Sequence, residues 1–164
     1  MSNTILARIR QLLTDNGVPF TEKEHPPTFT SEESAAARSE PLSVGAKALL
    51  LRTDNEFRLF VLPADLKLDS GAIRRELNIK KTRFATRDEL LELTGLVPGS
   101  VPPFGAPILP FELFADVEVG NAYGRVAFNA GELTHSIIMS AADWEAIAQP
   151  KRFRFAVADA SSNG

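Results

Sequence analysis

One apolar segment with a lysine at its centre, residues 44–51, constrains the fold of this chain most. It reads Val-Gly-Ala-Lys-Ala-Leu-Leu-Leu, a short apolar run typical of a buried β-strand. A polar segment, residues 52–56, and a second apolar run, residues 57–62, follow it, so the pattern predicts a β-hairpin. Burying an ammonium group costs several kcal/mol unless the charge is paired. Lys47 therefore either holds its charged head in water at a strand edge or stands at the centre of a site.

Helices and short strands surround this hairpin without any internal repeat. A helix is expected over residues 4–16, where apolar residues share one face and Gly17 follows. Thr30 or Ser31 is expected to cap a second helix, which Pro41 stops. Further helices are expected over residues 72–77, 87–94 and 141–148, and further strands over residues 108–113, 117–119, 126–129 and 136–139.

This order of elements predicts a single α+β domain, a mixed α/β arrangement with a largely antiparallel sheet flanked by helices. Several strands follow one another as hairpins and few strand–helix–strand units occur, which argues against a doubly wound parallel sheet. The domain is expected to span residues 1–155. The residues after position 155 are mostly small or polar, and we expect residues 156–164 to form a frayed tail.

The composition excludes several classes of chemistry. The 164 residues contain no cysteine, which rules out disulfides, thiolate metal sites and cysteine nucleophiles. Two histidines are too few for a three-histidine zinc site, and the motifs of phosphate-binding loops, dinucleotide folds and serine hydrolases are missing. We therefore expect no metal and no cofactor.

Charge and hydropathy restrict the location and the partners. No run of eighteen apolar residues occurs, and the first ten residues form an amphipathic pattern rather than an export signal, so a cytoplasmic protein without a membrane partner is expected. The net charge of −3 means that nucleic-acid contacts need a local basic patch. A solvated helix face is the plain alternative for any such patch. Basic residues cluster at Arg74, Arg75, Lys80, Lys81, Arg83 and Arg87, and more weakly at Lys151, Arg152 and Arg154.

A proline- and glycine-rich loop, residues 99–105, is the second feature that points to a site. It reads Gly-Ser-Val-Pro-Pro-Phe-Gly, where prolines fix the backbone and glycines let it approach a ligand closely. Such a rigid loop can aim the N–H groups of Gly99, Ser100 and Val101 at a carbonyl oxygen, as an oxyanion hole does. The alternative is a turn that only links a helix to a strand.

Four other side chains are candidates for the same site. His135 lies between two expected strands, and His25 precedes two prolines that could line the mouth of a pocket. Imidazole suits acid–base work near neutral pH, although a lone histidine is more often a hydrogen-bonded structural group. Thr30 and Ser31 either cap a helix only or present their hydroxyls and the helix N-terminus to a ligand.

The lysine strand and the glycine–proline loop together resemble the YbaK / prolyl-tRNA synthetase-associated editing domain family. The pattern is Gly-Ala-Lys-Ala at residues 45–48, followed after two helices by Gly99, Pro103 and Gly105. The likeness runs through most of the chain. It also covers residues 25–27, 30–33, 77–81, 83–85 and 129–131.

The resemblance implies strands that curl around a small pocket and a trans-editing aminoacyl-tRNA deacylase activity. Such proteins hydrolyse the ester of a tRNA that carries a wrong amino acid, typically a small one on the tRNA for proline. The family's lysine falls on Lys47. With the loop, this gives catalytic positions at Lys47, Gly99, Ser100 and Pro103, substrate-binding positions at Thr30, Ser31, His25, Gly105, His135 and Asn129, and tRNA contacts at Arg74, Lys80 and Lys81.

Two departures from the family pattern bear on the pocket. Some relatives have a second glycine where this chain has Ser100, and the alanine-editing branch has an asparagine where this chain has Ala48. The second departure weakens an alanine-specific assignment and favours another small side chain. Phe29, Leu50 and Ile137 are expected near the pocket.

The expected partners are a mischarged tRNA and, as a candidate, an aminoacyl-tRNA synthetase that recruits it, but no DNA. Two other functions stay open. One is a non-catalytic module that binds tRNA or a synthetase, with salt-sensitive affinity and no ester hydrolysis. The other is a hydrolase for a small ester unrelated to tRNA, for which the basic patch would be irrelevant.

Overall fold

The computed structural model describes residues 4–158, which form five α-helices, one short 3-10 helix and ten β-strands. The helices are α1 (Ile5–Asp15), α2 (Ser31–Arg38), η1 (Leu42–Val44), α3 (Ser70–Leu77), α4 (Arg87–Thr94) and α5 (Ala141–Ala148). The strands are β1 (Phe20–Glu24), β2 (Ala46–Thr53), β3 (Glu56–Pro63), β4 (Leu66–Leu68), β5 (Thr82–Phe84), β6 (Leu113–Ala115), β7 (Arg125–Asn129), β8 (His135–Ser140), β9 (Lys151–Arg152) and β10 (Ala156–Ala158).

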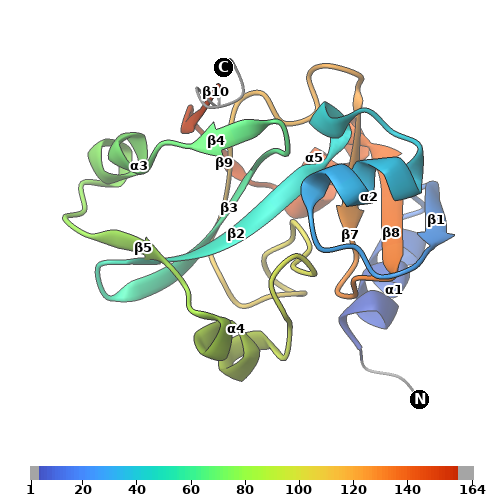
Figure 1. Cartoon of the computed structure of the whole chain (residues 1–164), viewed down its shortest axis with the longest axis horizontal. Helices are drawn as coiled ribbons and strands as arrows, with labels where there is room; N and C mark the ends of the chain where they lie inside the picture. Colours follow the sequence, from blue (N-terminus) through green and yellow to red (C-terminus); the bar gives the residue numbers. More distant parts are fainter. Residues whose placement is uncertain (1–3, 159–164) are drawn as a thin grey trace.

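The predicted hairpin is the centre of the largest sheet. Strands β2 and β3 pair antiparallel along their full length, from Ala46 opposite Pro63 to Thr53 opposite Glu56. The five strands stand in the order β5-β2-β3-β6-β9, and β6 runs parallel to both β3 and β9. The connection from β3 to β6 holds β4, α3, β5 and α4, which lie together beside the hairpin in Figure 1.

Two smaller sheets complete the domain, and every strand pair in them is antiparallel. Strands β1, β8 and β7 form one sheet, and β10 pairs with β4 in the other. A single parallel bridge between Gly45 and Ala127 joins the start of β2 to β7. The predicted α+β class and largely antiparallel pairing are therefore confirmed.

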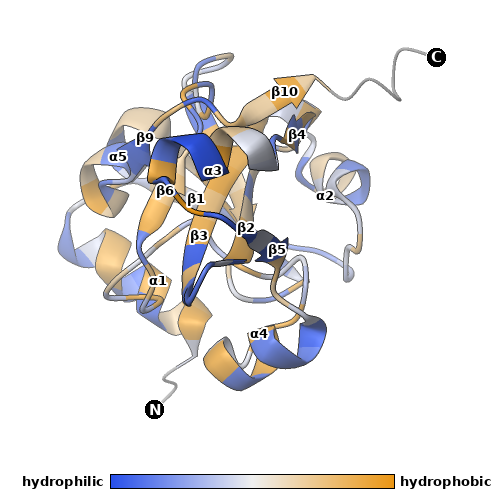
Figure 2. Ribbon diagram, turned by 90° about the vertical axis from the view of Figure 1, so that its left-hand side faces the viewer, coloured by the Kyte–Doolittle hydropathy of each residue, from blue (hydrophilic) through white to orange (hydrophobic). Residues whose placement is uncertain are grey.

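Much of the hairpin is buried on both faces, which explains its nearly continuous apolar sequence, whereas one face at the start of β2 is open. Alternate residues of β3 enter different cores: Leu59 and Val61 pack in the larger one, while Phe60 and Leu62 pack in the smaller one beneath α3. Figure 2 shows apolar colour along much of the central strands and polar colour on turns of α2 and α3.

Local capping explains where several helices begin. Thr4, Thr30, Asp69, Thr86 and Ser140 each accept a hydrogen bond at the side-chain oxygen from a backbone N–H in the first turn of the helix that follows. The predicted helices therefore lie close to where the sequence placed them, and α4 and α5 match their predicted bounds.

Three predictions about strands and the end of the chain are wrong. Residues 108–112 form turns, and the strand in this region is β6. Residues 117–119 also form a turn, in which the N–H of Val119 donates to the carbonyl of Asp116. Residues 156–158 of the predicted frayed tail are β10, held by β4, while residues 159–164 lie outside the described part. Within residues 4–158, no helix is long and apolar enough to cross a membrane.

Candidate active site

A pocket of about 820 Å³ opens above the first half of β2. Its walls come from the start of α2 with the residues before it, the 3-10 helix, the first residues of β2, the β4 region and the loop at residues 98–101, with single contributions from β3 and β5 and two residues of β7. Its lining includes Thr28, Phe29, Thr30, Ser31, Glu32, Ser34, Arg38, Lys47, Asp65, Lys67, Phe84, Gly99, Val101 and Asn129.

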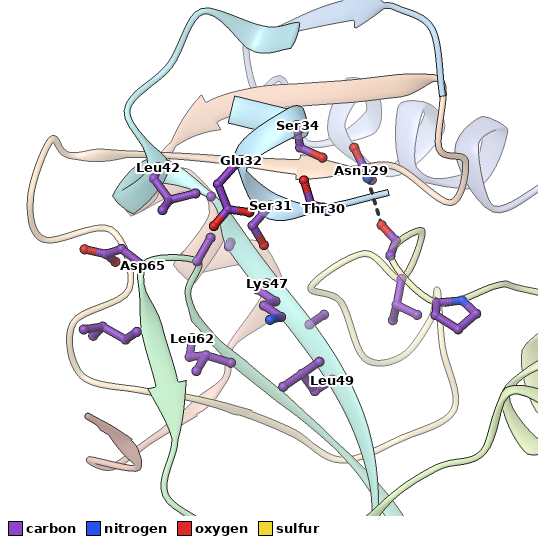
Figure 3. A pocket seen from close by; sticks show the side chains of 18 of the residues that line it. Thr30, Ser31, Glu32, Ser34, Leu42, Lys47, Leu49, Leu62, Asp65 and Asn129 are labelled. Carbon is purple, nitrogen blue, oxygen red and sulfur yellow. Dashed lines mark hydrogen bonds between the residues drawn. The ribbon is translucent and has the colours of Figure 1, made fainter. Parts of the chain in front are cut away.

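Lys47 lies in the middle of this pocket. Its side chain points off β2 into the cavity beneath Ser31, as Figure 3 shows, and it is exposed. It makes no hydrogen bond or ion pair with any residue in the described part of the chain. An ammonium group without a protein partner is free to bind a phosphate or a polarised carbonyl oxygen.

The loop at residues 98–101 lines the same pocket and holds backbone N–H groups that have no acceptor within residues 4–158. Gly99 has φ +90°, a conformation that side-chain-bearing residues rarely adopt. Among residues 4–158, no acceptor binds the N–H of Gly99 or Val101, and both residues line the cavity. Ser100 is different, because it is buried and its N–H donates to the carbonyl of Val97 at 3.1 Å. Of the three predicted oxyanion donors, only Gly99 and Val101 are therefore available.

Ser100, Pro103 and Gly105 hold the loop in shape from beneath rather than lining the cavity. The Ser100 hydroxyl donates to the Val97 carbonyl at 2.8 Å, and the Pro103 carbonyl accepts the indole N–H of Trp144 at 2.9 Å. A Cβ on Gly105 would lie 2.8 Å from the carbonyl oxygen of Phe111, so only glycine fits there.

A buried polar network fixes the loop from the opposite side. The Asn129 amide donates to the Gly99 carbonyl at 2.8 Å, and its oxygen accepts from the Arg38 guanidinium at 3.0 Å. Arg38 also donates to the Ser136 hydroxyl at 2.9 Å, which lies 3.1 Å from the Asn129 oxygen. The Nε2 atom of His25 lies 2.8 Å from the same hydroxyl. The network thus ties α2, β7 and β8 to the peptide that presents the loop N–H groups.

These features coincide with a match to a known family. The model of the aminoacyl-tRNA editing domain matches residues 25–147, which include the pocket, the lysine and the loop. The chain belongs to the aminoacyl-tRNA editing domain family. The family predicted from the sequence is confirmed.

Relatives of similar length support this assignment. The editing domain is 33% identical over 153 residues to the "Multifunctional Ser/Thr-tRNA deacylase ProXp-y" of Escherichia coli K12, with 90% of each chain covered. It is 31% identical to the "Prolyl-tRNA editing protein ProX" of Acetoanaerobium sticklandii, with 79% of this chain and 82% of that protein covered. A crystal structure of a candidate trans-editing enzyme for prolyl tRNA synthetase has the same fold, with a TM-score of 0.75, 24% identity, and 94% and 98% coverage.

The editing domain brings some of the other predicted residues to the pocket. Thr30 and Ser31 line it; the Thr30 oxygen is occupied by the N–H of Glu33 at 3.1 Å, whereas Ser31 forms no side-chain bond within residues 4–158. Two exposed carboxylates, Glu32 and Asp65, line it without an ion pair in the described part of the chain. The cavity therefore offers both signs of charge.

Both histidines lie away from the cavity. His25 belongs to the network behind it, and His135 at the start of β8 pairs with Glu132 at 2.8 Å and Glu24 at 3.7 Å. Of the three apolar residues expected near the pocket, Phe29 lines it, whereas Leu50 and Ile137 are in the core and do not. The prediction for Leu50 and Ile137 is wrong because β-strand alternation turns both inward.

The three predicted tRNA contacts also lie outside the cavity. Arg74 is on α3. The backbone N–H groups of Lys80 and Lys81 donate to the carboxylate of Asp54, and both lysine side chains are exposed. Their contact with tRNA stays a prediction. In the residues that the structure describes, no group of three histidine, aspartate or glutamate side chains could hold a metal ion.

Arg38 is one of several pocket residues that were not predicted from the sequence, together with Asp65, Lys67 and Phe84. Its side chain is only 5% exposed, and no carboxylate pairs with it in the described chain. Burial lowers its pKa to about 10, partly opposed by the charge of Glu40, so it stays cationic at neutral pH. The available signal was the spacing of Ser34 and Arg38, which places two polar residues on one helix face.

We expect Arg38→Met to slow ester hydrolysis about tenfold and to lower the melting temperature by a few degrees. The variant removes a donor that orients Asn129, and small errors in positioning a reacting group cost rate. It also takes a hydrogen bond away from each of the buried side chains of Asn129 and Ser136, which costs stability. Arg125→Met is the matched control, because Arg125 pairs with Glu40 at 2.8 Å and does not line the pocket. Unchanged hydrolysis by the Arg38 variant would show that the network does not matter for the reaction.

Proposed function

We propose that the protein is a trans-editing aminoacyl-tRNA deacylase that hydrolyses the ester between a tRNA and a small non-cognate amino acid. The observation that carries the proposal is a single pocket lined by an unpaired lysine and by two backbone N–H groups without acceptors, in a member of the editing domain family. The names of the relatives ProXp-y and ProX support the same class of enzyme, a hydrolase of aminoacyl-tRNA esters.

The chemistry needs no strong nucleophile, because an aminoacyl ester is already activated. A pocket that orients the ester beside one water molecule supplies much of the rate through proximity. The N–H groups of Gly99 and Val101 are placed to stabilise the developing oxyanion, and Lys47 grips the 3′-terminal phosphate or polarises the carbonyl. The proton transfers fall to a ribose hydroxyl of the tRNA itself. These roles agree with the absence of cysteine from the chain.

The lining of the pocket favours a small, hydroxyl-bearing amino acid. Hydroxyl side chains line the cavity, among them Thr28, Thr30, Ser31 and Ser34. Those of Thr28 and Ser34 bond each other at 2.7 Å, whereas the Ser31 hydroxyl has no partner within the described residues. The relative ProXp-y is named for serine and threonine, so these two esters are the first candidates here. An aminoacyl ester also carries an α-ammonium group, which the carboxylates of Glu32 and Asp65 attract.

The finer details of the partners belong to the same proposal. The tRNA is the one for proline, since the relative ProX is named as a prolyl-tRNA editing protein. Contacts from Arg74, Lys80 and Lys81 would add a salt-dependent part to the affinity. The net charge of −3 makes recruitment by a synthetase useful, and the protein would act in the cytoplasm without binding DNA.

A deacylation panel tests this function. The tRNA for proline is charged separately with serine, threonine, alanine, cysteine, 2-aminobutyrate and proline, and ester loss is followed with and without the protein. We expect fast loss of serine or threonine and a stable prolyl ester, because a site that hydrogen-bonds a substrate hydroxyl strongly rejects an analogue that lacks it. Binding of every charged tRNA without hydrolysis would instead identify a non-catalytic module.

A further inference from the structure

Two aromatic side chains stand in water at the edge of the pocket. Phe29 is 73% exposed and Phe84 is 58% exposed, which makes them the two most exposed large apolar side chains between residues 4 and 158. Single exposed apolar residues are normal on a protein surface. Here, however, both line the same cavity although they come from segments 55 positions apart in the chain. Two exposed aromatic rings at one cavity therefore suggest a binding role for both.

Hydrogen bonds fix the backbone beneath both rings, while the rings themselves stay exposed. The N–H of Phe29 donates to the Glu33 carboxylate at 2.7 Å, just before the cap of α2. Phe84 pairs with Leu51 across β5 and β2, and its carbonyl accepts a hydrogen bond from Arg83 at 3.2 Å. A rigid backbone under an exposed ring lowers the entropy cost of binding a ligand to that ring.

The charges around these rings indicate what kind of ligand they meet. Lys47 and Lys67 line the same cavity, and neither side chain forms an ion pair within the described residues. The carboxylates of Glu32 and Asp65 line the cavity as well, and they suit the α-ammonium group of the amino acid. Flat aromatic surfaces beside unpaired cations match the rest of the substrate, a ligand with flat rings and phosphates, which is the chemistry of single-stranded nucleic acid. A purely apolar partner would leave both ammonium groups without a counter-charge.

We propose that Phe29 and Phe84 form an aromatic rim that stacks the unpaired nucleobases at the 3′ end of the tRNA. The proposal rests on the proposed function, since it is the ester at this end that enters the pocket. Stacking tolerates any base, because every base has a flat π face. The rim therefore holds the acceptor end over Lys47 without reading its sequence, and selection among tRNAs falls to other contacts.

The test compares Phe29→Ala and Phe84→Ala with Phe29→Tyr and Phe84→Tyr. The substrate is an aminoacylated acceptor-stem minihelix with an unpaired 3′ end. We expect each alanine variant to raise KM about tenfold with little change in kcat. Each tyrosine variant should have the wild-type KM, because tyrosine keeps the flat ring on which a base stacks. Tyr123→Ala is the control, as Tyr123 is 51% exposed and lies outside the pocket.

A second substrate separates base stacking from a change in pocket shape. In a minihelix whose last two nucleotides lack their bases, the alanine variants and the wild type are expected to have the same KM. The proposal of an aromatic rim would be overturned by an equal rise in KM on both substrates, or by no rise on the minihelix that keeps all its bases.

Failure of the rim is distinguishable from failure of the enzyme. If the wild type hydrolyses the ester and the alanine variants match it, the deacylase stands and the rim is wrong. If the wild type hydrolyses nothing, fluorescence polarisation with the uncharged minihelix decides: about tenfold weaker binding by the alanine variants supports the rim, and equal binding overturns it.

Discussion

Lys47→Ala is expected to lower the rate of ester hydrolysis by about a hundredfold or more. The loss of one preorganised group that stabilises charge in the transition state typically costs a factor of 10²–10³. The melting temperature should change little, because the exposed Lys47 side chain forms no hydrogen bond or ion pair within residues 4–158. Single-turnover deacylation and thermal unfolding of the same preparation measure both effects.

Lys67→Ala is the matched control for this variant. Lys67 is an exposed lysine of β4 that lines the same cavity, so its removal takes away the same charge. We expect only a few-fold loss, which salt should diminish further. If both lysine variants lost activity equally, the general potential of the pocket, and not the position of Lys47, would explain the effect.

Gly99→Ala is expected to reduce hydrolysis by a similar factor, about a hundredfold. Space is not the obstacle, since the nearest atom to a Cβ at this position is the Leu133 Cδ2 at 3.4 Å. The obstacle is the φ of +90°, which alanine adopts only with strain. The loop would therefore relax and turn the N–H groups of Gly99 and Val101 away from the oxyanion.

Gly95→Ala provides a control with the same backbone strain at a different place. Gly95 ends α4 with φ +77°, has no atom within 4 Å of a Cβ, and does not line the pocket. Its alanine variant should lose stability but keep the wild-type rate of hydrolysis. Equal activity of the Gly99 and Gly95 variants would mean that the loop geometry is not used in catalysis.

The sequence predicted the parts of this site that depend on local patterns. A lysine in an apolar run, a polar turn and a returning apolar run define the β2–β3 hairpin without reference to distant residues. Thr30 and Thr86 begin helices through contacts within four residues of the cap. The position of Lys47 on a strand and the turn at Gly99 follow from the same short-range rules.

The network around Arg38 could not be predicted in this way. Arg38, Asn129 and Ser136 are far apart in the chain, and only the packing of α2 against β7 and β8 brings them together. The spacing of Ser34 and Arg38 places both on one face of α2, but it does not indicate which distant side chains this face meets. The sequence also could not show which loop N–H groups lack an acceptor. That depends on the hydrogen bond from the Ser100 N–H to the Val97 carbonyl, which only the folded loop forms.

The absence of the strand that was predicted to begin at residue 108 has a backbone cause. Ile108 and Leu109 are buried and apolar, as in a strand, but Pro107 and Pro110 flank them and cannot donate to a sheet. Both N–H groups bind the carbonyl of Gly105 instead, at 2.9 Å. Strand β10 was not predicted, because its short sequence carries no strand pattern of its own. Its pairing with β4 decides its conformation.

The most direct test of the central proposal is a single-turnover experiment with the wild-type protein in excess over seryl- or threonyl-tRNA for proline. The release of amino acid and the binding of tRNA are measured in the same samples. We predict rapid ester loss that Lys47→Ala and Gly99→Ala reduce nearly to the uncatalysed rate, while the prolyl ester survives. Salt-sensitive binding with every ester intact would contradict the proposal and identify a module that binds tRNA without hydrolysing it.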